Sequence, residues 1–501
     1  MKHQVLLIIC DGWGYRKESK HNTIDAAHKP HFDYLWNNYP HTLIQASGES
    51  IGLPKGQIGT SEANHLILGS GRIVYQNLLK INHAIKNKTF FENKAIKEAF
   101  DHVIKFKSTL HIKGMVSPGG VHGHVEHIKA LVVSAKNAGI ENIMFHLFTD
   151  GRDVPPMSAI EYLKDFENFL KDIGVGKIAS IGGRYWGMDR DNNEDRIEKH
   201  FKVMVVGEGP RFKTPIEVIE NAYSKKITDE FIEPSLIQFK NDEIGCIKPN
   251  DAVVFTNFRS DRAKQLTKRF LKENIKNLKY ISMTKYADDF DIRIAFSPEQ
   301  ITNTLTEVIS KNNLKQLKVT ETEKFTHLTF FFNAQRYKAE DNENRIMIPS
   351  NKDIPTHDLK PEMKTPEIAI EVMKAIKDQE YDFICINLVN ADILGHTTNF
   401  KATIKGIETI DKALGDILEV AKKYNIDILI TADHGNAEEN FNEATNQPIS
   451  AHTTNPVPFI LYSKKYKKIT HKNGSLSDVA PTILKLLELP IPKEMTGKSF
   501  V

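Results

Sequence analysis

The stretch "IDILITADHGNAEE", Ile426 to Glu439, joins a largely apolar run to a carboxylate and an imidazole in adjacent positions. The run is typical of a buried strand, and Gly435 marks the point where that strand has ended. Asp433 and His434 therefore come after the carboxyl end of a predicted strand. The stretch alone leaves two interpretations open: Asp433 caps a following helix, or the pair binds a ligand at the strand end.

Composition places the chain among globular proteins with a sizeable core. The 501 residues, 40% of them hydrophobic and 26% charged, are enough for two or three domains. The net charge is only +3 and the pI about 8.4, so the protein lacks the strong overall field that suits nucleic acid or an anionic membrane. We therefore expect neither partner, and any anionic ligand must be held by local clusters.

Cysteine usage and the N-terminal segment predict a reducing, cytoplasmic environment. Cys10, Cys246 and Cys385 cannot form a complete disulfide framework, and each lies in or beside an apolar segment. The apolar run from Val5 to Cys10 is too short for the core of a signal peptide or for a membrane span.

Two series of predicted strands alternate with helical patterns, which favours an α/β fold. One series comprises the first ten residues, 328–333, 382–388, 426–431 and 459–462, and the other comprises 109–117, 142–151, 177–184 and 251–259. Carboxylates and histidines come after strands of the first series, whereas arginines come after strands of the second. We therefore predict a metal-binding catalytic domain of residues 1–77 and 298–501, with a substrate-binding α/β domain of residues 78–297 inserted into it.

Carboxylates and imidazoles lie just beyond several strands of the first series. Each alone is more often a cap or a structural residue, but parallel strands bring their carboxyl ends to one edge of a sheet, where ligands bind. Such donors without thiolates suit Mn²⁺ or Zn²⁺, and two ions would share them better than one. The predicted donors are Asp11, Asp392, His396, Asp433, His434 and His452.

A hydroxyl suited to phosphoryl transfer lies in "KGQIGTSEANHLILGSG", where Ser61 precedes a predicted helix from Glu62 to Leu68. An isolated serine at a helix start is usually an N-cap. Here backbone N–H groups could also hold a phosphate, while a metal ion could lower the pKa of the hydroxyl.

The second series carries a set of arginines, together with two histidines of "GGVHGHVEH". Surface arginines are normally solvated, but the guanidinium also matches carboxylate and phosphate, so a small doubly anionic substrate would fit. The set comprises His122, His124, Arg152, Asp153, Arg184, Arg190, Arg259 and Arg262.

From end to end the chain resembles the cofactor-independent phosphoglycerate mutases of the alkaline phosphatase superfamily. The matching motifs are "DGWG" (11–14), "QIGTSEANHLILGSGR" (57–72), "GGVHGHVEH" (119–127), "TDGRDVPP" (149–156), "GRYWGMDRD" (183–191), "NFRSDRAKQL" (257–266), "DLKPEMKTPE" (358–367), "ADHGNAEE" (432–439) and "AHTTNPVPF" (451–459). One departure comes after the Phe run, where Asn333-Ala334-Gln335 stands in place of the family's usual paired glycines.

The resemblance implies roles for particular residues. Asp392, His396 and His452 would hold one Mn²⁺, and Asp11, Ser61, Asp433 and His434 the other. Ser61, Asp153 and Lys324 would be catalytic, Lys324 being taken from "EKFTHLTFFFN". The substrate would be bound by His122, Arg152, Asp153, Arg184, Arg190, Arg259, Arg262 and Lys324.

The activity implied by the resemblance is interconversion of 3-phosphoglycerate and 2-phosphoglycerate, a step of glycolysis and gluconeogenesis. It would run through a phosphoserine with two Mn²⁺ ions and without 2,3-bisphosphoglycerate. We expect a monomer whose domains close around the substrate, with hinges at the two joints.

Two other functions would use part of the same residue set. A phosphomonoesterase or phosphopentomutase would keep the metal ligands but lack the matched arginine motifs. A non-catalytic protein stabilised by metal would keep the ligands without needing Ser61.

Overall fold

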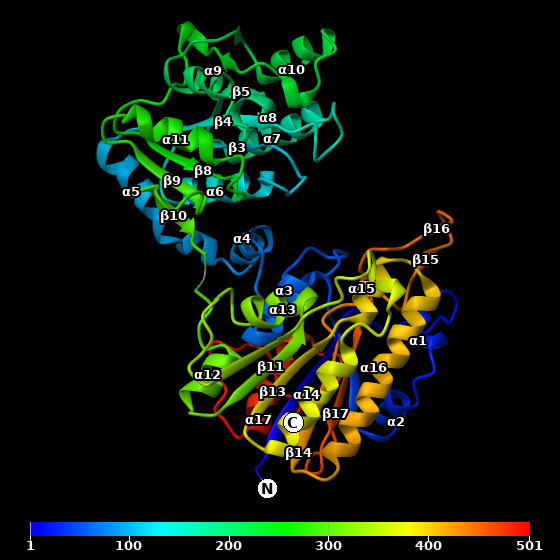
Figure 1. Cartoon of the computed structure of the whole chain (residues 1–501). Helices are drawn as coiled ribbons and strands as arrows, with labels where there is room; N and C mark the ends of the chain where they lie inside the picture. The colour runs from blue at the N-terminus through cyan, green and yellow to red at the C-terminus, as the bar shows by residue number, and fades with distance from the viewer. Residues whose placement is uncertain (1, 299) are drawn as a thin grey trace. The chain divides into compact units, whose positions relative to one another are not determined.

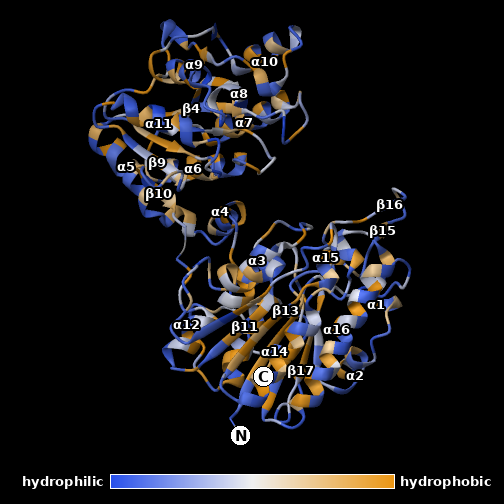
Figure 2. Cartoon of the chain, viewed as in Figure 1, coloured by the Kyte–Doolittle hydropathy of each residue, from blue (hydrophilic) through white to orange (hydrophobic). Residues whose placement is uncertain are grey.

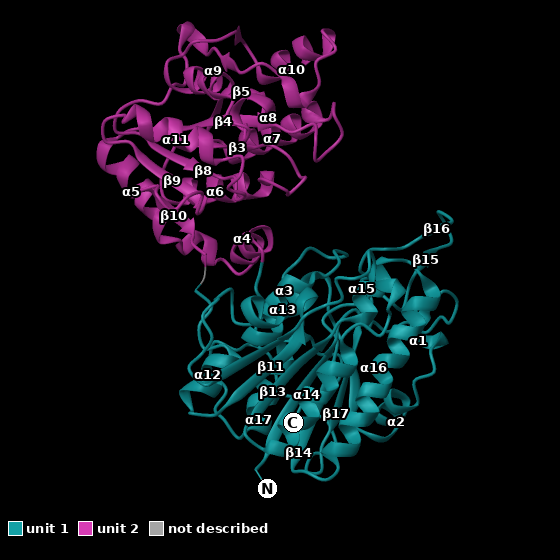
Figure 3. Ribbon diagram, viewed as in Figure 1, with its two compact units in different colours: residues 1–75, 300–501 teal, residues 76–299 magenta. Residues whose placement is uncertain are grey.

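The chain forms two compact units, and the computed structural model describes residues 2–298 and 300–501 (Figure 3). Unit 1 comprises Met1–Tyr75 and Gln300–Val501, and unit 2 comprises Gln76–Glu299. The joints expected from the sequence, after residues 77 and 297, lie close to these limits. Among the described residues, no helix combines the length and apolar character needed to cross a bilayer.

Unit 1 is built on a seven-stranded sheet with the order β12-β11-β13-β1-β14-β17-β2 (Figure 1). The first five strands are mutually parallel, whereas β17 pairs antiparallel with both β14 and β2. A short hairpin lies outside this sheet, β15 Phe441–Asn442 with β16 Gln447–Pro448. The strands of the sheet are β1 Gln4–Cys10, β2 His41–Ile44, β11 Gln316–Glu321, β12 Glu343–Ile348, β13 Phe383–Leu388, β14 Ile426–Thr431 and β17 Val457–Tyr462.

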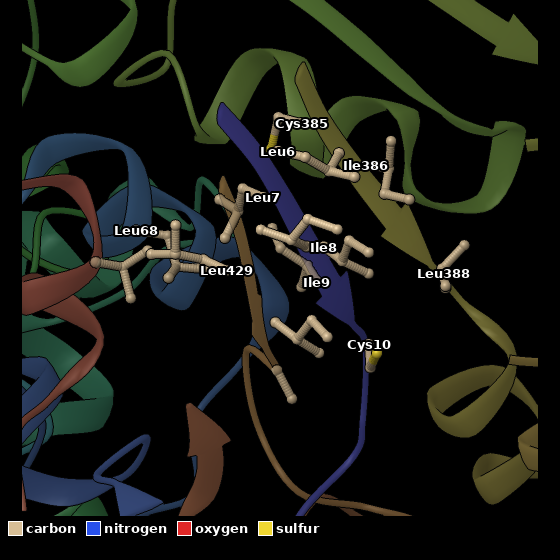
Figure 4. Packing of buried hydrophobic residues seen from close by; sticks show 14 of the residues in the cluster. Leu6, Leu7, Ile8, Ile9, Cys10, Leu68, Cys385, Ile386, Leu388 and Leu429 are labelled. Atoms are coloured by element: carbon tan, nitrogen blue, oxygen red, sulfur yellow. The ribbon is translucent and has the colours of Figure 1, made fainter. Parts of the chain in front are cut away.

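The central strands are mostly apolar and are buried along their whole length, as expected when helices cover both faces of a sheet. Every residue of β1, β13 and β14 is buried, and Figure 2 shows the sheet as mostly hydrophobic against helices of mixed character. Leu7 of β1 pairs with Leu429 of β14 and with Cys385 of β13. Figure 4 shows these side chains and Leu68 within one packed cluster.

Two sets of helices pack in unit 1. One set is centred on α16, which contacts α1, α2, α14 and α15, and the other consists of α3, α12 and α17, which contact one another. Helix α16 has an apolar stripe, as the spacing of Ile407, Leu414 and Leu418 predicts. The helices are α1 Thr23–Ala26, α2 Pro30–Asn38, α3 Ser61–Ser70, α12 Leu305–Lys311, α13 Thr322–Thr326, α14 Thr365–Asp378, α15 Asn390–His396, α16 Phe400–Ala421 and α17 Val479–Leu486.

One predicted strand is wrong. The run "LTFFFN" at 328–333 is helical, because α13 continues into a π-helical turn over His327–Phe331. A short apolar run is compatible with either a buried strand or a buried helix, and periodicity does not separate them. The strand of this region is β11, a segment of mixed polarity whose six residues are nevertheless all buried.

Unit 2 is built on an eight-stranded sheet with the order β10-β9-β8-β3-β4-β5-β7-β6. The strands from β10 to β5 are parallel, and β7 pairs antiparallel with β5. The four strands predicted for this region are present as β3, β4, β5 and β8. The strands are β3 Leu110–Met115, β4 Ile143–Thr149, β5 Lys177–Gly183, β6 Arg211–Phe212, β7 Ser235–Ile237, β8 Ala252–Phe255, β9 Lys279–Thr284 and β10 Arg293–Phe296.

Helices pack on this second sheet around aromatic side chains such as Phe145 and Phe166, whose rings meet edge to face with centroids 5.2 Å apart. Both units therefore have the α/β architecture expected from the sequence. The helices of unit 2 are α4 Asn77–Lys86, α5 Lys94–Phe106, α6 Val125–Asn137, α7 Ala159–Ile173, α8 Arg184–Gly187, α9 Glu194–Val205, α10 Pro215–Ser224 and α11 Lys264–Glu273.

Candidate active site

The carboxyl ends of four adjacent strands in unit 1 deliver three predicted carboxylate donors and one lysine. Asp11 comes directly after β1, Asp392 lies in the helix after β13, Asp433 lies just beyond β14, and Lys324 lies in the helix after β11. Because these strands are parallel neighbours, their ends meet at one edge of the sheet. All four side chains are buried, with at most 4% of any residue exposed.

No helix begins at Asp433, so the capping interpretation of the opening stretch is wrong. The segment between β14 and β15 is irregular, and the Asp433 carboxylate instead accepts hydrogen bonds from the backbone N–H of Gly12 and of His434. Gly12 has a φ of +78°, and a Cβ there would lie 2.5 Å from Cα of Asp392. Only glycine therefore lets the β1 and β13 ends approach so closely.

Lys324 is at the centre of the cluster. Its Nζ lies 2.8 Å from Oδ1 of Asp11, 2.7 Å from Oδ2 of Asp392 and 2.7 Å from Oγ of Ser61. Ser61 is the first residue of α3, and Thr60, not Ser61, is its N-cap, accepting a hydrogen bond from the N–H of Ala63. The Ser61 hydroxyl therefore does not cap the helix, and its Oγ lies 2.8 Å from Nε2 of His434.

Three histidines complete the cluster. The rings of His434 and His452 stack with centroids 3.5 Å apart. Nε2 of His396 and of His452 lie 3.1 and 3.2 Å from the same oxygen of Asp392. The Nδ1 atoms of these two rings contact backbone carbonyls, of Ser450 and of Gly59, which leaves each Nε2 directed at the carboxylate. Second hydrogen bonds of this kind commonly orient histidines that bind metals.

The charges of the cluster perturb the pKa of each member. Burial alone would raise the pKa of Asp392, but the Lys324 ammonium and the imidazoles outweigh it and hold that pKa well below its usual value. For Asp11, burial and the nearby Asp433 charge prevail, and its pKa is raised. Burial would lower the pKa of Lys324, but Asp11 and Asp392 together raise it, so the amine is firmly charged.

The donor set fits divalent cations. Three buried carboxylates share a single ammonium, which leaves negative charge that is costly without further cations. Within residues 2–298 and 300–501, Oδ2 of Asp433 is buried without a hydrogen-bond partner. Candidate ligand atoms lie within 4.8 Å of one another in two groups, Asp392–His434–His452 and Asp11–Asp433–His434. His434 belongs to both groups, so the two groups lie next to each other.

In unit 2, the arginine set lies at the carboxyl ends of the adjacent strands β8, β3, β4 and β5. Arg184 is buried, and its Nη1 lies 2.6 Å from Oδ1 of Asp150 and also contacts Asp153. Arg190 and Arg259 both pair with Asp261, at 3.2 and 3.1 Å. The structure thus gathers the predicted substrate residues of unit 2, whereas Lys324 lies in unit 1 among the metal donors. The gathered residues are His122, Arg152, Asp153, Arg184, Arg190, Arg259 and Arg262.

Several residues of these clusters were not predicted from the sequence. Asn387 donates to Asp11 Oδ2 at 2.6 Å and to His65 Nε2 at 3.0 Å, and His65 Nδ1 lies 2.9 Å from the carbonyl oxygen of Ser61. The sequence does contain a signal for the role of Asn387: it is a polar residue within the buried strand "FICINL", and a buried amide needs hydrogen-bond partners. In unit 2, Asp150 and Asp261 were likewise missed, although both lie inside the motifs that supply the arginines.

Comparison with known proteins identifies relatives over the whole chain. The family model "BPG-independent PGAM N-terminus" matches residues 81–288, and "Type I phosphodiesterase / nucleotide pyrophosphatase" matches residues 294–481. The chain is 44% identical to the 2,3-bisphosphoglycerate-independent phosphoglycerate mutase of Clostridium acetobutylicum, covering 99% of each chain. It is 43% identical to that of Francisella philomiragia, covering 100% of this chain and 99% of the other.

The chain also resembles a solved structure over nearly its whole length. That structure is of Leishmania mexicana phosphoglycerate mutase at low cobalt concentration. The two chains are 28% identical in sequence, with a TM-score of 0.54. The similarity covers 99% of this chain and 97% of that one.

Proposed function

The chain belongs to the family of 2,3-bisphosphoglycerate-independent phosphoglycerate mutases, and on that premise we propose that it interconverts 3-phosphoglycerate and 2-phosphoglycerate through a phosphoserine at Ser61. The observation that carries the proposal is the position of the Ser61 hydroxyl. It lies at the start of α3, 2.7 Å from the Lys324 ammonium and 2.8 Å from His434. A competing metal-binding function without catalysis would have no use for this hydroxyl.

We assign the metal-binding catalytic role to unit 1 and the substrate-binding role to unit 2. Asp392, His396 and His452 would hold one ion, and Asp11, Ser61, Asp433 and His434 the other. When bound, two divalent ions such as Mn²⁺ would lower the pKa of the Ser61 hydroxyl and offset charge on the phosphoryl oxygens.

Residues of the chain itself support phosphoryl transfer to Ser61. As an alkoxide, Oγ attacks the phosphorus of 3-phosphoglycerate, and the bond between phosphorus and the 3-oxygen breaks as the Oγ–P bond forms. The Lys324 ammonium lies within hydrogen-bonding distance of Oγ and offsets negative charge on the transferred group. The backbone N–H groups at the start of α3 can donate to the phosphoryl oxygens, as helix N-termini commonly do.

The second half of the reaction needs glycerate to stay bound while its hydroxyls exchange roles. Asp153 would give a proton to the released 3-oxygen and take one from the 2-hydroxyl, whose oxygen then attacks the phosphoserine and regenerates the Ser61 alkoxide. Arg184 contacts Asp153 and would hold it beside the glycerate. We assign the glycerate carboxylate to Arg184 and Arg190, and the phosphoryl group to Arg259 and Arg262.

The activity is tested with purified full-length protein, 3-phosphoglycerate and Mn²⁺, without 2,3-bisphosphoglycerate. We expect 2-phosphoglycerate to form and EDTA to abolish its formation. A requirement for added 2,3-bisphosphoglycerate would contradict the proposal.

The phosphoserine is tested with Ser61→Ala, which removes the attacking oxygen. Mass spectrometry after substrate addition should detect one phosphoryl group on the parent and none on the variant, which should also lose mutase activity. Ser70→Ala, at the other end of α3, is the matched control and should keep both properties. Mutase activity that survives in Ser61→Ala would refute the assignment.

A further inference from the structure

The arginines of unit 2 are neutralised unequally by carboxylates of the same unit. Arg184 pairs with Asp150 and Asp153, and Arg152 lies 3.2 Å from Glu230. Arg190 and Arg259 instead share one carboxylate, that of Asp261.

Asp261 contacts several of the donors proposed to bind substrate. Its Oδ2 lies 3.2 Å from Nη1 of Arg190, and its Oδ1 lies 3.1 Å from Nε of Arg259 and 3.6 Å from Nδ1 of His122. That ring nitrogen is buried and has no hydrogen-bond partner. The carboxylate therefore contacts two guanidinium groups and an imidazole, the kind of donor set that recognises a phosphate or carboxylate ligand.

The anchoring of Asp261 differs from that of Asp150. The Asp150 side chain is only 2% exposed, contacts the Ser117 hydroxyl and accepts from the backbone N–H groups of Arg152 and Asp153 as well as from Arg184. The Asp261 side chain is 31% exposed, and among the described residues only Arg262 donates a backbone N–H to it. A rotation of this side chain would free its cationic partners without disturbing a buried network.

We propose that Asp261 is an internal competitor for the anion-binding position of unit 2: its carboxylate occupies the Arg190 and Arg259 donors, beside the unpaired Nδ1 of His122, until an anionic ligand displaces it. The proposal rests on the substrate-binding role assigned to these residues. A phosphoryl group with two negative charges gains more from two guanidinium groups than the single carboxylate does, whereas a weakly charged anion does not. Asp261 would thus weaken the binding of weakly charged small anions more than the binding of the doubly anionic substrate.

The opposite role predicts the opposite result. If Asp261 only held the arginines in position, neutralising it would loosen them and weaken anion binding. If Asp261 competes with the ligand, neutralising it strengthens binding. The sign of the change in affinity therefore separates the two roles.

The test is Asp261→Asn in the full-length protein, with inorganic phosphate as the probe in isothermal titration calorimetry. EDTA is present so that bound metal in unit 1 does not attract the anion. The substituted amide keeps an oxygen that can accept from the Arg262 N–H. We expect about tenfold tighter phosphate binding, a modest factor because the displaced contacts are half-exposed.

Asp288→Asn is the matched control, because it makes the same charge change at an exposed aspartate that pairs with Lys285. It should leave the phosphate affinity unchanged. Asp261→Ser is a second variant, which also removes the charge and should tighten binding in the same direction.

Unchanged or weaker phosphate binding in both Asp261 variants would overturn the proposal. The measurement needs no turnover, so this failure is distinct from failure of the proposed mutase activity. With active enzyme, Asp261→Asn should also lower the KM for 3-phosphoglycerate without raising kcat, a split that a loss of arginine positioning would not produce.

Discussion

The two candidate sites carry opposite excess charge. In unit 1, two buried carboxylates contact the Lys324 ammonium and a third, that of Asp433, lies in the same cluster, where no side chain is more than about half exposed. In unit 2, the side chains of Arg152, Arg190 and Arg259 are 53%, 44% and 49% exposed and pair with carboxylates at the surface. Each site thus lacks the charge that its proposed ligand brings: metal cations in unit 1 and a small anion in unit 2.

The largest effect is expected from Lys324→Met, because it removes the single ammonium shared by the buried carboxylates. Activity should fall by a factor on the order of 10³, and the metal-depleted protein should lose about 3–5 kcal/mol of stability. Mn²⁺ should restore part of that stability by neutralising the same carboxylates. Urea denaturation with and without Mn²⁺ measures both effects.

Lys318→Met is the control for this comparison. Lys318 is also buried, on β11, where its partner is Glu343 at 3.3 Å. Its loss should destabilise the protein, but Mn²⁺ should not compensate. If Mn²⁺ stabilised Lys324→Met and Lys318→Met equally, the proposal that the carboxylate cluster of unit 1 needs cations would be contradicted.

Lys113 in unit 2 provides a contrast with Lys324, because it is buried among aromatic rings instead of carboxylates. Its Nζ lies 3.9 Å from the centroid of the Phe270 ring and has no hydrogen-bond partner among the residues that the structure describes. Burial lowers the pKa of Lys113 well below its usual value. Lys113→Met should therefore stabilise the protein by about 2–4 kcal/mol near neutral pH.

The pH dependence of this effect has a definite sign. Between the lowered pKa of the folded state and the ordinary value of about 10.4, only the unfolded chain binds the proton at Lys113, so its contribution to stability increases with pH. The gain from Lys113→Met should shrink as the pH rises toward 10. Lys177→Met, at an exposed position of β5, should show neither effect. A destabilised Lys113→Met would mean that the amine has a polar partner.

Arg190→Ala tests whether unit 2 retains the glycerate. Glycerate escape would leave the phosphoserine open to water, so the ratio of inorganic phosphate to 2-phosphoglycerate should rise by about tenfold to a hundredfold. Metal content should stay unchanged because no metal donor is altered. Arg196→Ala is the control, since Arg196 pairs with Asp189 outside the proposed site. An unchanged ratio of inorganic phosphate to 2-phosphoglycerate in Arg190→Ala would contradict the proposal that Arg190 of unit 2 retains the glycerate.

Metal binding in unit 1 should depend on pH through His396 and His452. The hydrogen bond and charge of Asp392 raise the pKa of His396. Burial alone would lower the pKa of His452, but the hydrogen bond and charge of the same carboxylate outweigh burial and raise that pKa as well. Without metal, these His–Asp392 contacts stabilise the fold below pH about 6.5 and are lost as the pH rises through the raised values. Mn²⁺ must displace these protons, so its stabilising effect should grow between about pH 5.5 and 8.

Thermal unfolding with and without Mn²⁺ across that range checks the prediction. Excess Mn²⁺ should move the midpoint of the pH dependence lower, because metal and protons compete for the same nitrogens. If the midpoint of the pH dependence did not change with Mn²⁺ concentration, the pH dependence would come from another titrating group.

The smallest effect is expected where the chain departs from the paired glycines usual in its family. Ala334 and Gln335 have φ values of 54° and 62°, a left-handed conformation that suits glycine. Ala334→Gly should raise stability by about 0.5–1 kcal/mol. Ala444→Gly, at a residue outside the positive-φ set, should instead lose a few tenths of a kcal/mol. Chemical denaturation can compare the two, and a loss in Ala334→Gly would show that the turn is not strained.

The sequence by itself determined the α/β class and most of the residues gathered at the two sites. Largely apolar runs such as Ile426–Ile430 are local signals of strands. Parallel strands bring the residues beyond their carboxyl ends to one edge of a sheet, so Asp11, Asp392 and Asp433 could be predicted to meet. The capping interpretation of Asp433 and the strand at 328–333 were wrong for a shared reason. A single acid after a strand, or a short apolar run, fits more than one structure until its neighbours in space are known.

Only the tertiary structure decided which charges face one another. Lys324 could be assigned with the substrate residues by resemblance, but its contacts with Asp11 and Asp392 join residues more than sixty positions apart. Asn387, His65 and Asp261 were missed because their importance lies in their partners and not in their own local pattern. Electrostatic and hydrogen-bonding energies depend on distance and burial, and both are set by how distant segments pack, which local sequence does not encode.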